Sequence, residues 1–213
     1  MSDDLSGVTV GTSAREVDPR DPWRRVAAAA FVLTAAQLAV ATFVPGLPQF
    51  EGKAFGARLA SYPCLMLLVP AIWALVRQRR GGTRPLPWSG FAFLMFPFGV
   101  DVTGNTADLY DQLWWWDDLN HYVNWVLLCI GIGLLLGRGH VRPAWALALL
   151  VAGLGAILAI AWELGEWYTF IRHGTEFASA YEDTLGDLAL GTLGGVTSGV
   201  ALALRARRAG PVP

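Results

Sequence analysis

Six apolar segments follow one another along the chain, with short polar or charged stretches between them. They cover residues 26–47, 59–76, 88–105, 119–137, 144–162 and 188–204. Each is close to the roughly 20 residues that a helix needs to cross a hydrocarbon core about 30 Å thick. The pattern therefore predicts an all-α, polytopic integral membrane protein with six transmembrane helices.

Composition supports this class. Hydrophobic residues make up 54% of the chain and charged residues only 15%, which is typical of a membrane protein and unusual for a soluble domain. The net charge of -1 supplies no bulk attraction for nucleic acid, so we expect membrane lipids and no nucleic acid as partners. Nothing in the pattern specifies an oligomeric state.

The basic residues are unevenly distributed between the segments. Thirteen of the 16 lie in the first 25 residues, in alternate connections or at the C-terminal end, and only Lys53, Arg58 and Arg172 lie on the other side. By the positive-inside rule this predicts six crossings with both termini cytoplasmic. The preference for arginine over lysine suggests a bacterial genome, and hence the bacterial inner membrane. We expect a disordered cytoplasmic tail at 1–22, a transmembrane domain at 23–208 and a C-terminal tail at 209–213.

Acidic residues beyond the first tail gather at the opposite, extracytoplasmic side. Four predicted helix ends there carry paired polar groups at helical spacing. The four sets are Asp101, Asn105 and Asp108; Asp117, Asp118 and His121; Glu163 and Glu166; and Asp183 and Asp187. We expect the four sets to converge on one polar site.

Helix capping accounts for some of these acids and not for others. Asp117, Asp118 and Asp183 lie near helix starts, where a carboxylate caps free amides without any further function. Asp101 and Glu163 lie near helix C-terminal ends, where the helix dipole disfavours an acid. Asp101 also lies roughly 20 Å beyond Trp88 along the helix, so that it needs a partner inside the membrane.

A row of glycines continues the last acidic pair. Gly191, Gly195 and Gly199 follow Asp187 at every fourth residue, which is a close-packing pattern for helices in a bilayer. We expect this row to hold the sixth segment against a neighbour and to turn Asp183 and Asp187 toward the interior.

Carboxylates and an imidazole crowded at low dielectric favour proton uptake or a cation. The donor types fit a divalent metal, and Mg, Mn, Zn, Ca and Fe are all compatible with them. The expected ligands are Asp101, Asp117, Asp118, His121, Glu163 and Asp187, with Glu166 or Asp183 as a general base and Asn105 and Asp108 as further polar groups. The tryptophans at 114–116, 162 and 167 are typical of an interfacial belt.

Four short motifs, in order, carry a family resemblance. They are Asp-x-x-Gly-Asn at 101–105, DDLNH at 117–121, ELGEW at 163–167 and YEDTLGDL at 181–188. Together they resemble the YjdF-like family of bacterial inner-membrane proteins, a domain of unknown function. The last two segments have a looser likeness to VanZ-like proteins, although Gly191 stands where those have Asn, and Tyr181 and Glu182 stand where they have Arg.

Two classes of function therefore stay open. One is a metal-dependent hydrolase or transferase acting on a lipid or lipid-linked envelope substrate. The other is a cation- or proton-coupled transport or binding protein that uses the same acids. The VanZ likeness adds a non-enzymatic role in envelope resistance.

Overall fold

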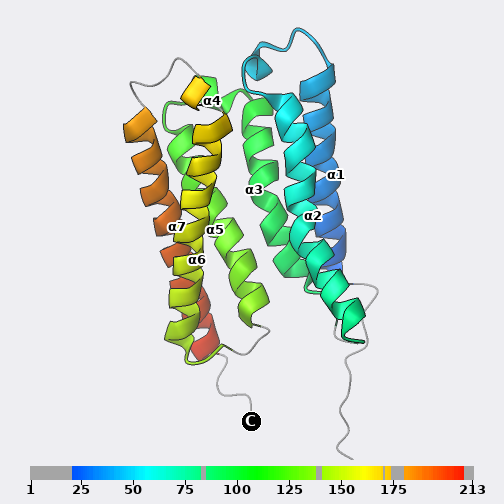
Figure 1. Cartoon of the computed structure of the whole chain (residues 1–213), viewed down its shortest axis with the longest axis vertical. Coiled ribbons are helices and arrows are strands. Elements are labelled where there is room, and N and C mark those ends of the chain that lie inside the picture. Colours follow the sequence, from blue (N-terminus) through cyan, green and yellow to red (C-terminus); the bar gives the residue numbers. More distant parts are fainter. Residues whose placement is uncertain (1–20, 83–84, 138–140, 170, 174–179, 209–213) are drawn as a thin grey trace, which may run out of the picture.

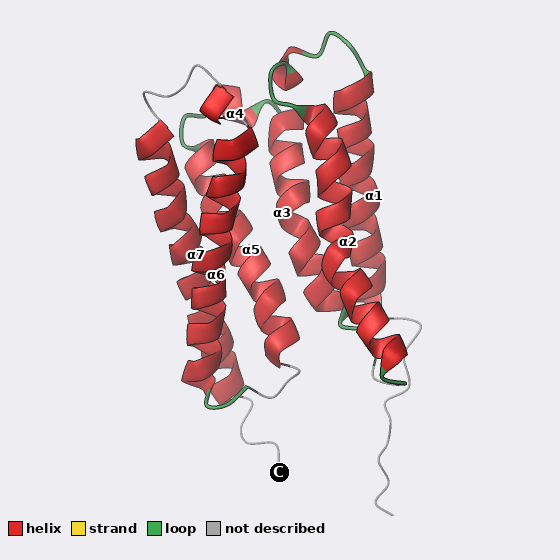
Figure 2. Cartoon of the chain, in the orientation of Figure 1, coloured by secondary structure: helices red, strands yellow, loops and turns green. Residues whose placement is uncertain are grey.

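A computed structural model describes residues 21–82, 85–137, 141–169, 171–173 and 180–208. Within these ranges the chain is all-helical, with seven α-helices and two single-turn 3-10 helices (Figure 2). The α-helices are α1 (Pro22–Phe43), α2 (Phe55–Arg79), α3 (Trp88–Thr106), α4 (Leu109–Gln112), α5 (Trp116–Gly137), α6 (Ala144–Thr169) and α7 (Ala180–Arg208); the 3-10 helices are η1 (Pro48–Phe50) and η2 (Ile171–His173).

The six long helices run alternately up and down and form two groups of three, α1 with α2 and α3, and α5 with α6 and α7 (Figure 1). Packing is most extensive between α6 and α7, and α3 joins the groups by packing along α5. The short helix α4 lies at one end of the bundle, which we call the α4 end. The N-terminal end of α1 and the C-terminal end of α7 lie at the opposite end.

Each of the six predicted apolar segments forms a helix, with shifted ends. Helix α1 stops at Phe43 because Val44 precedes a proline and adopts an extended conformation. Helix α7 begins at Ala180, eight residues before the predicted segment, so that it includes both aspartates. Residues 1–20 and 209–213, where we expect tails, lie outside the described residues.

Five of the described helices are long and apolar enough to cross a membrane: α1, α2, α5, α6 and α7. Helix α3, which corresponds to the third predicted segment, is not among them. It is 19 residues long but carries Asp101 and Asn105, and Phe91, Ala92 and Val102 on it are almost fully buried. Because α1 and α5 pack along it, α3 shows less of its surface to the surroundings and can carry polar residues.

The glycine row of α7 packs against a neighbouring helix, as predicted, and that neighbour is α6. A Cβ atom on Gly199 would lie 2.5 Å from the carbonyl oxygen of Ala148, and one on Gly195 would lie 3.3 Å from that of Ala152. A Cβ on Gly191 would lie 2.9 Å from the Cβ of Ala159. The absence of these side chains is what allows the two backbones to approach so closely.

The outer faces of the helices are apolar, and the described arginines of the predicted cytoplasmic set lie at the end away from α4. Arg24 and Arg25 begin α1, Arg77 and Arg79 end α2, and Arg205, Arg207 and Arg208 end α7. Leu68, Leu149 and Ile157 are each more than half exposed, although they belong to the apolar segments. Such faces are suited to contact with acyl chains.

Candidate functional site

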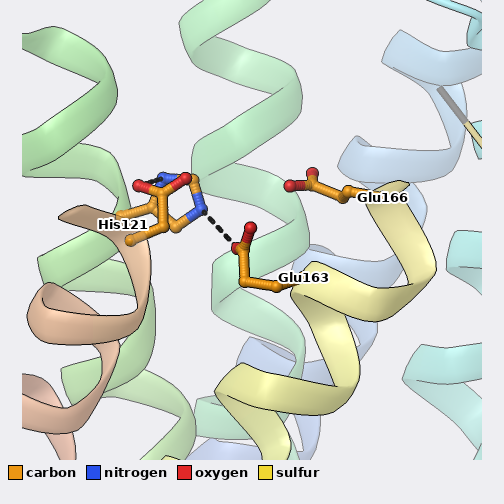
Figure 3. Close-up of side chains that lie close together, drawn as sticks. His121, Glu163 and Glu166 are labelled. Atoms are coloured by element: carbon orange, nitrogen blue, oxygen red, sulfur yellow. Dashed lines mark ion pairs between the residues drawn. The ribbon is translucent and has the colours of Figure 1, made fainter. Parts of the chain in front are cut away.

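Three helices bring four of the predicted polar residues together near the α4 end. His121 comes from α5, Glu163 and Glu166 from α6, and Asp187 from α7. One ligand atom from each lies within 4.8 Å of those of the other three. Figure 3 shows both glutamates projecting from α6 toward the imidazole. We call these four residues the donor cluster.

His121 lies at the centre of the donor cluster. Its Nδ1 atom is 3.0 Å from Oδ1 of Asp187, and its Nε2 atom is 4.0 Å from Oε1 of Glu163 (Figure 3). The Nδ1 atom is buried and makes no hydrogen bond among the described residues. The side chain is 14% exposed, and Glu163 and Asp187 are buried more deeply.

The register of α6 against α7 explains why the cluster forms. The two helices are antiparallel, and Gly199 meets Ala148 while Gly191 meets Ala159. One turn further along, the same register places Asp187 across from Glu163. Glu166 is three residues after Glu163 and therefore shares its face of α6. The small-residue interface thus fixes the distance between the acids of two helices.

A cavity of about 150 Å³ opens beside the donor cluster. Its lining includes His121 and Glu166, whereas Glu163 and Asp187 lie behind them and do not line it. Pro97, Phe98, Trp125 and Leu128 supply apolar walls. The cavity therefore exposes two members of the cluster to a ligand and has a largely apolar surface around them.

Asp101 lies on the far wall of the same cavity and is not part of the donor cluster. Its Oδ2 atom accepts hydrogen bonds from Nη1 of Arg58 at 2.7 Å and from the hydroxyl of Tyr62 at 2.8 Å. Its Oδ1 atom accepts one from the hydroxyl of Tyr110 at 2.8 Å and a longer one from Nδ2 of Asn105 at 3.4 Å. The charge of Asp101 is thus balanced by Arg58 of α2, and both of its carboxylate oxygens already accept hydrogen bonds.

A chain of hydrogen bonds continues from Asp101 along the cavity. Nδ2 of Asn120 donates to the hydroxyl oxygen of Tyr110 at 2.6 Å, and Nδ2 of Asn124 donates to Oδ1 of Asn120 at 3.0 Å. Burial and the nearby Asp101 carboxylate raise the pKa of the Tyr110 hydroxyl, which keeps it protonated and able to donate. Oδ1 of Asn124 is buried without a hydrogen-bond partner among the described residues. Asn124 lines the cavity, so a bound ligand could donate a hydrogen bond to this oxygen.

The remaining predicted residues lie near the donor cluster or apart from it. Asp117 is adjacent, with Oδ1 3.6 Å from Nδ1 of His121, and half of its side chain is exposed. Asp118 is exposed on α5 and is not part of the donor cluster. Asp183 is also exposed, so the expectation that it faces the interior is wrong. It lies in the first turn of α7, where a carboxylate favours the helix start.

The stripe that we expected from Asp101 through Asn105 to Asp108 is interrupted. Helix α3 ends at Thr106, and Asp108 adopts a left-handed backbone conformation with φ of 59°. Its carboxylate accepts a hydrogen bond from Gln112 within the turn that begins α4. Asn105 is buried and donates to Asp101, whereas Asp108 is only partly buried and is separated from them by the end of α3.

Trp162 differs from the prediction of an interfacial belt. It packs against the apolar core between α1, α2 and α3 and also against the core around α5 and α6. It lines the cavity beside the donor cluster. Trp114, by contrast, is 90% exposed, which suits an interfacial position.

Several polar residues of the site were not identified from the sequence: Arg58, Tyr62, Tyr110, Asn120 and Asn124. The available signal was Arg58 itself, one of three basic residues assigned to the extracytoplasmic side and positioned at the start of an apolar segment. An arginine at that place is a natural partner for a buried aspartate on the next helix.

The fold and this site define a class of protein: a helical membrane protein with a His and carboxylate cluster beside a cavity at one end of its bundle. The profile of the family described as "Predicted membrane protein (DUF2238)" matches residues 26–208, and the chain belongs to this family. This is consistent with the resemblance to YjdF-like proteins, whereas the VanZ likeness receives no support. No curated protein and no solved structure matches the chain.

Proposed function

We propose that this protein binds a divalent metal ion in the donor cluster and uses it to hydrolyse or transfer part of a lipid or lipid-linked envelope substrate. The observation that carries the proposal is the convergence of His121, Glu163, Glu166 and Asp187 from three helices, with His121 and Glu166 also lining a cavity. Three carboxylates this close repel one another unless a cation or protons compensate their charge.

The size of the cluster supports an ion. Donor atoms that bind a transition metal at about 2.1 Å lie at most about 4.2 Å apart. The donor atoms of the cluster all lie within 4.8 Å of one another. Side-chain movements of about half an ångström would therefore bring them within the distance that one ion allows. One imidazole and several carboxylates are a donor set that Zn, Mn and Fe accept.

The position of each residue relative to the cavity suggests its role. His121, Glu163 and Asp187 would be the ligands, since catalytic metal sites commonly have three protein ligands and one open position. Glu166 faces the cavity and would accept a proton from the attacking water and return it to the leaving group. The ion would supply polarisation of the substrate and of that water.

The proposal includes an orientation. With α3 as a sixth crossing, both termini lie on the cytoplasmic side of a bacterial inner membrane, and the α4 end faces outward. The arginines at the ends of α1, α2 and α7 support this by the positive-inside rule. The donor cluster would then lie near the outer headgroups.

A rival function has its own supporting observation. The hydrogen-bond chain from Asp101 through Tyr110 and Asn120 to Asn124 is of the kind that proton-coupled proteins use. In that case the four residues of the donor cluster would share protons and not an ion.

Elemental analysis of the detergent-purified full chain separates the two. We expect a stoichiometric transition metal that is lost in His121→Ala and in Asp187→Asn. The matched control is Asp118→Asn, which removes an exposed acid of the same helix as His121 and should leave the metal content unchanged. Protein that is free of metal after mild purification and takes up no added Zn, Mn or Fe would overturn the proposal in favour of the proton network.

A further inference from the structure

A second cavity, of about 270 Å³, lies between α2 and α6. Figure 1 shows these two helices on the same side of the bundle, in front of α3 and α5. Arg58, Tyr62, Trp162 and Glu166 line both this cavity and the one beside the donor cluster. The two cavities therefore share a wall, and the second one leads from the side of the bundle toward the cluster. We call it the lateral cavity.

The mouth of the lateral cavity is formed by small or apolar residues that are exposed. They are Ala57, Ser61 and Leu65 on α2, and Ala161 and Gly165 on α6. Both helices are among the five candidate membrane spans, so in a bilayer this mouth would face acyl chains. From Ala57 to Leu65 it extends about 12 Å along α2, at 1.5 Å per residue. That distance reaches from the headgroup region into the hydrocarbon.

The inner wall of the lateral cavity carries a cation. Among the described residues that line the two cavities, Arg58 is the only arginine or lysine. Nη1 of Arg58 donates a hydrogen bond to Asp101. Among the described residues, Nη2 and Nε of Arg58 make no hydrogen bond. A guanidinium with unused donors is the group that proteins use to hold a phosphate.

From these observations we propose that the ligand is a phosphate-bearing lipid that enters sideways between α2 and α6. Its phosphate binds Arg58, its acyl chain leaves along Leu65, and its headgroup reaches Glu166 and His121. This deepens the proposed function by naming the substrate class, and it rests on that function for any chemistry. Lipid binding itself can be measured separately from metal content.

Gly165 allows a variant that blocks the mouth. A Cβ atom at this position would meet no atom within 4 Å, so a side chain can start there without a clash, and we expect a leucine to obstruct the mouth. Gly153 offers a matched control, since it lies on the same helix, is also exposed, and has nothing within 4 Å of a Cβ atom. It does not line the lateral cavity.

The probe is dioleoylphosphatidic acid, added to the detergent-purified full chain and measured by native mass spectrometry with metal content determined in parallel. Dioleoylglycerol is the same lipid without the phosphate, and inorganic phosphate is the headgroup without the chain. We expect one phosphatidic acid bound per chain. Dioleoylglycerol should bind about tenfold more weakly or worse, because it lacks the charge-assisted contact with Arg58. Inorganic phosphate should also bind at least about tenfold more weakly, because it lacks the acyl chains that bury apolar surface.

Gly165→Leu should lose phosphatidic acid binding while its metal content stays unchanged, and Gly153→Leu should keep both. Arg58→Lys retains a positive charge beside Asp101 but loses the planar guanidinium with its several donors. The affinity for phosphatidic acid should therefore fall by about tenfold, and the affinity for dioleoylglycerol should not change.

Three results would each overturn the proposal. Dioleoylglycerol could bind as tightly as phosphatidic acid, inorganic phosphate could bind as tightly as phosphatidic acid, or Gly165→Leu could leave the binding of phosphatidic acid unchanged. The two proposals fail in different ways. A metal-containing protein without phosphatidic acid selectivity overturns the lipid site alone. A metal-free protein that binds phosphatidic acid in the expected pattern overturns the metal proposal alone.

Discussion

Arg58 on α2 holds Asp101 on α3 by a hydrogen bond of 2.7 Å between Nη1 and Oδ2, with both side chains mostly buried. Loss of the guanidinium leaves an uncompensated charge, which typically costs about 3–5 kcal/mol in a buried pair. We therefore expect Arg58→Met to lower the melting temperature in detergent strongly. Arg58→Met combined with Asp101→Asn should recover much of the loss, because the charge that needed a partner is gone.

If the double variant were no more stable than Arg58→Met, the guanidinium would contribute through packing over Phe55 and Tyr62 and not through its charge.

The α6 and α7 interface predicts a strong contrast between two glycines of α7. A Cβ atom on Gly199 would lie 2.5 Å from the backbone oxygen of Ala148, and one on Gly186 would meet nothing within 4 Å. Gly199→Ala should therefore destabilise the fold by about 1–3 kcal/mol, because the helices must move apart. Gly186→Ala should be neutral or should stabilise it by up to about 1 kcal/mol, because alanine favours the helix. Thermal unfolding of both variants in one detergent measures the difference, and equal melting temperatures would contradict the packing described.

Metal binding should raise the stability of the folded state. An ion that binds the folded chain alone contributes about 2.7 kcal/mol at a concentration a hundredfold above its Kd. We expect added Zn or Mn to raise the melting temperature of chelator-treated protein, and Asp187→Asn to abolish this shift. Asp183→Asn serves as the control, because that acid is exposed and lies outside the donor cluster. A shift of the same size in all three proteins would indicate binding at a different place.

Asp111 gives a pH-dependent contact outside the candidate spans. Its carboxylate accepts a 2.6 Å hydrogen bond from Nζ of Lys53, and this hydrogen bond lowers the pKa of Asp111 below its ordinary value. The pair of Lys53 and Asp111 therefore contributes fully to stability above the pKa that Asp111 has in the unfolded chain, about 3.9. This contribution is lost as the pH falls through the lower pKa that Asp111 has in the folded protein.

The effect is small, because the side chain of Asp111 is more than half exposed and salt screens the pair. The difference in melting temperature between the protein and Asp111→Asn should shrink as the pH is lowered below about 4. A difference that grows in acid would contradict this assignment.

The helices could be predicted from the sequence because each apolar segment is long and its boundaries carry proline, glycine or charge. The convergence of His121, Glu163 and Asp187 could also be predicted, since helical spacing and a glycine row give the direction in which a side chain points. Helix α3 shows the limit of hydropathy, because a helix enclosed by α1 and α5 can tolerate polar residues that an exposed one could not.

Contacts between distant segments could not be predicted in the same way. Arg58 and Asp101 are 43 residues apart, and no periodicity relates a residue of α2 to one of α3. Asp183 and Asp187 lie on the same every-fourth-residue stripe as the glycine row, yet only Asp187 is buried. Tertiary packing, and not local pattern, decides which acids belong to the cluster.

The donor cluster comes entirely from α5, α6 and α7, whereas Arg58 and three of the five mouth residues come from α2. The proposed chemistry and the proposed preference for a phosphate-bearing lipid therefore depend on largely different helices. We expect substitutions in α2 to change which lipid is bound, while the closely packed α5, α6 and α7 keep the arrangement of the donor cluster.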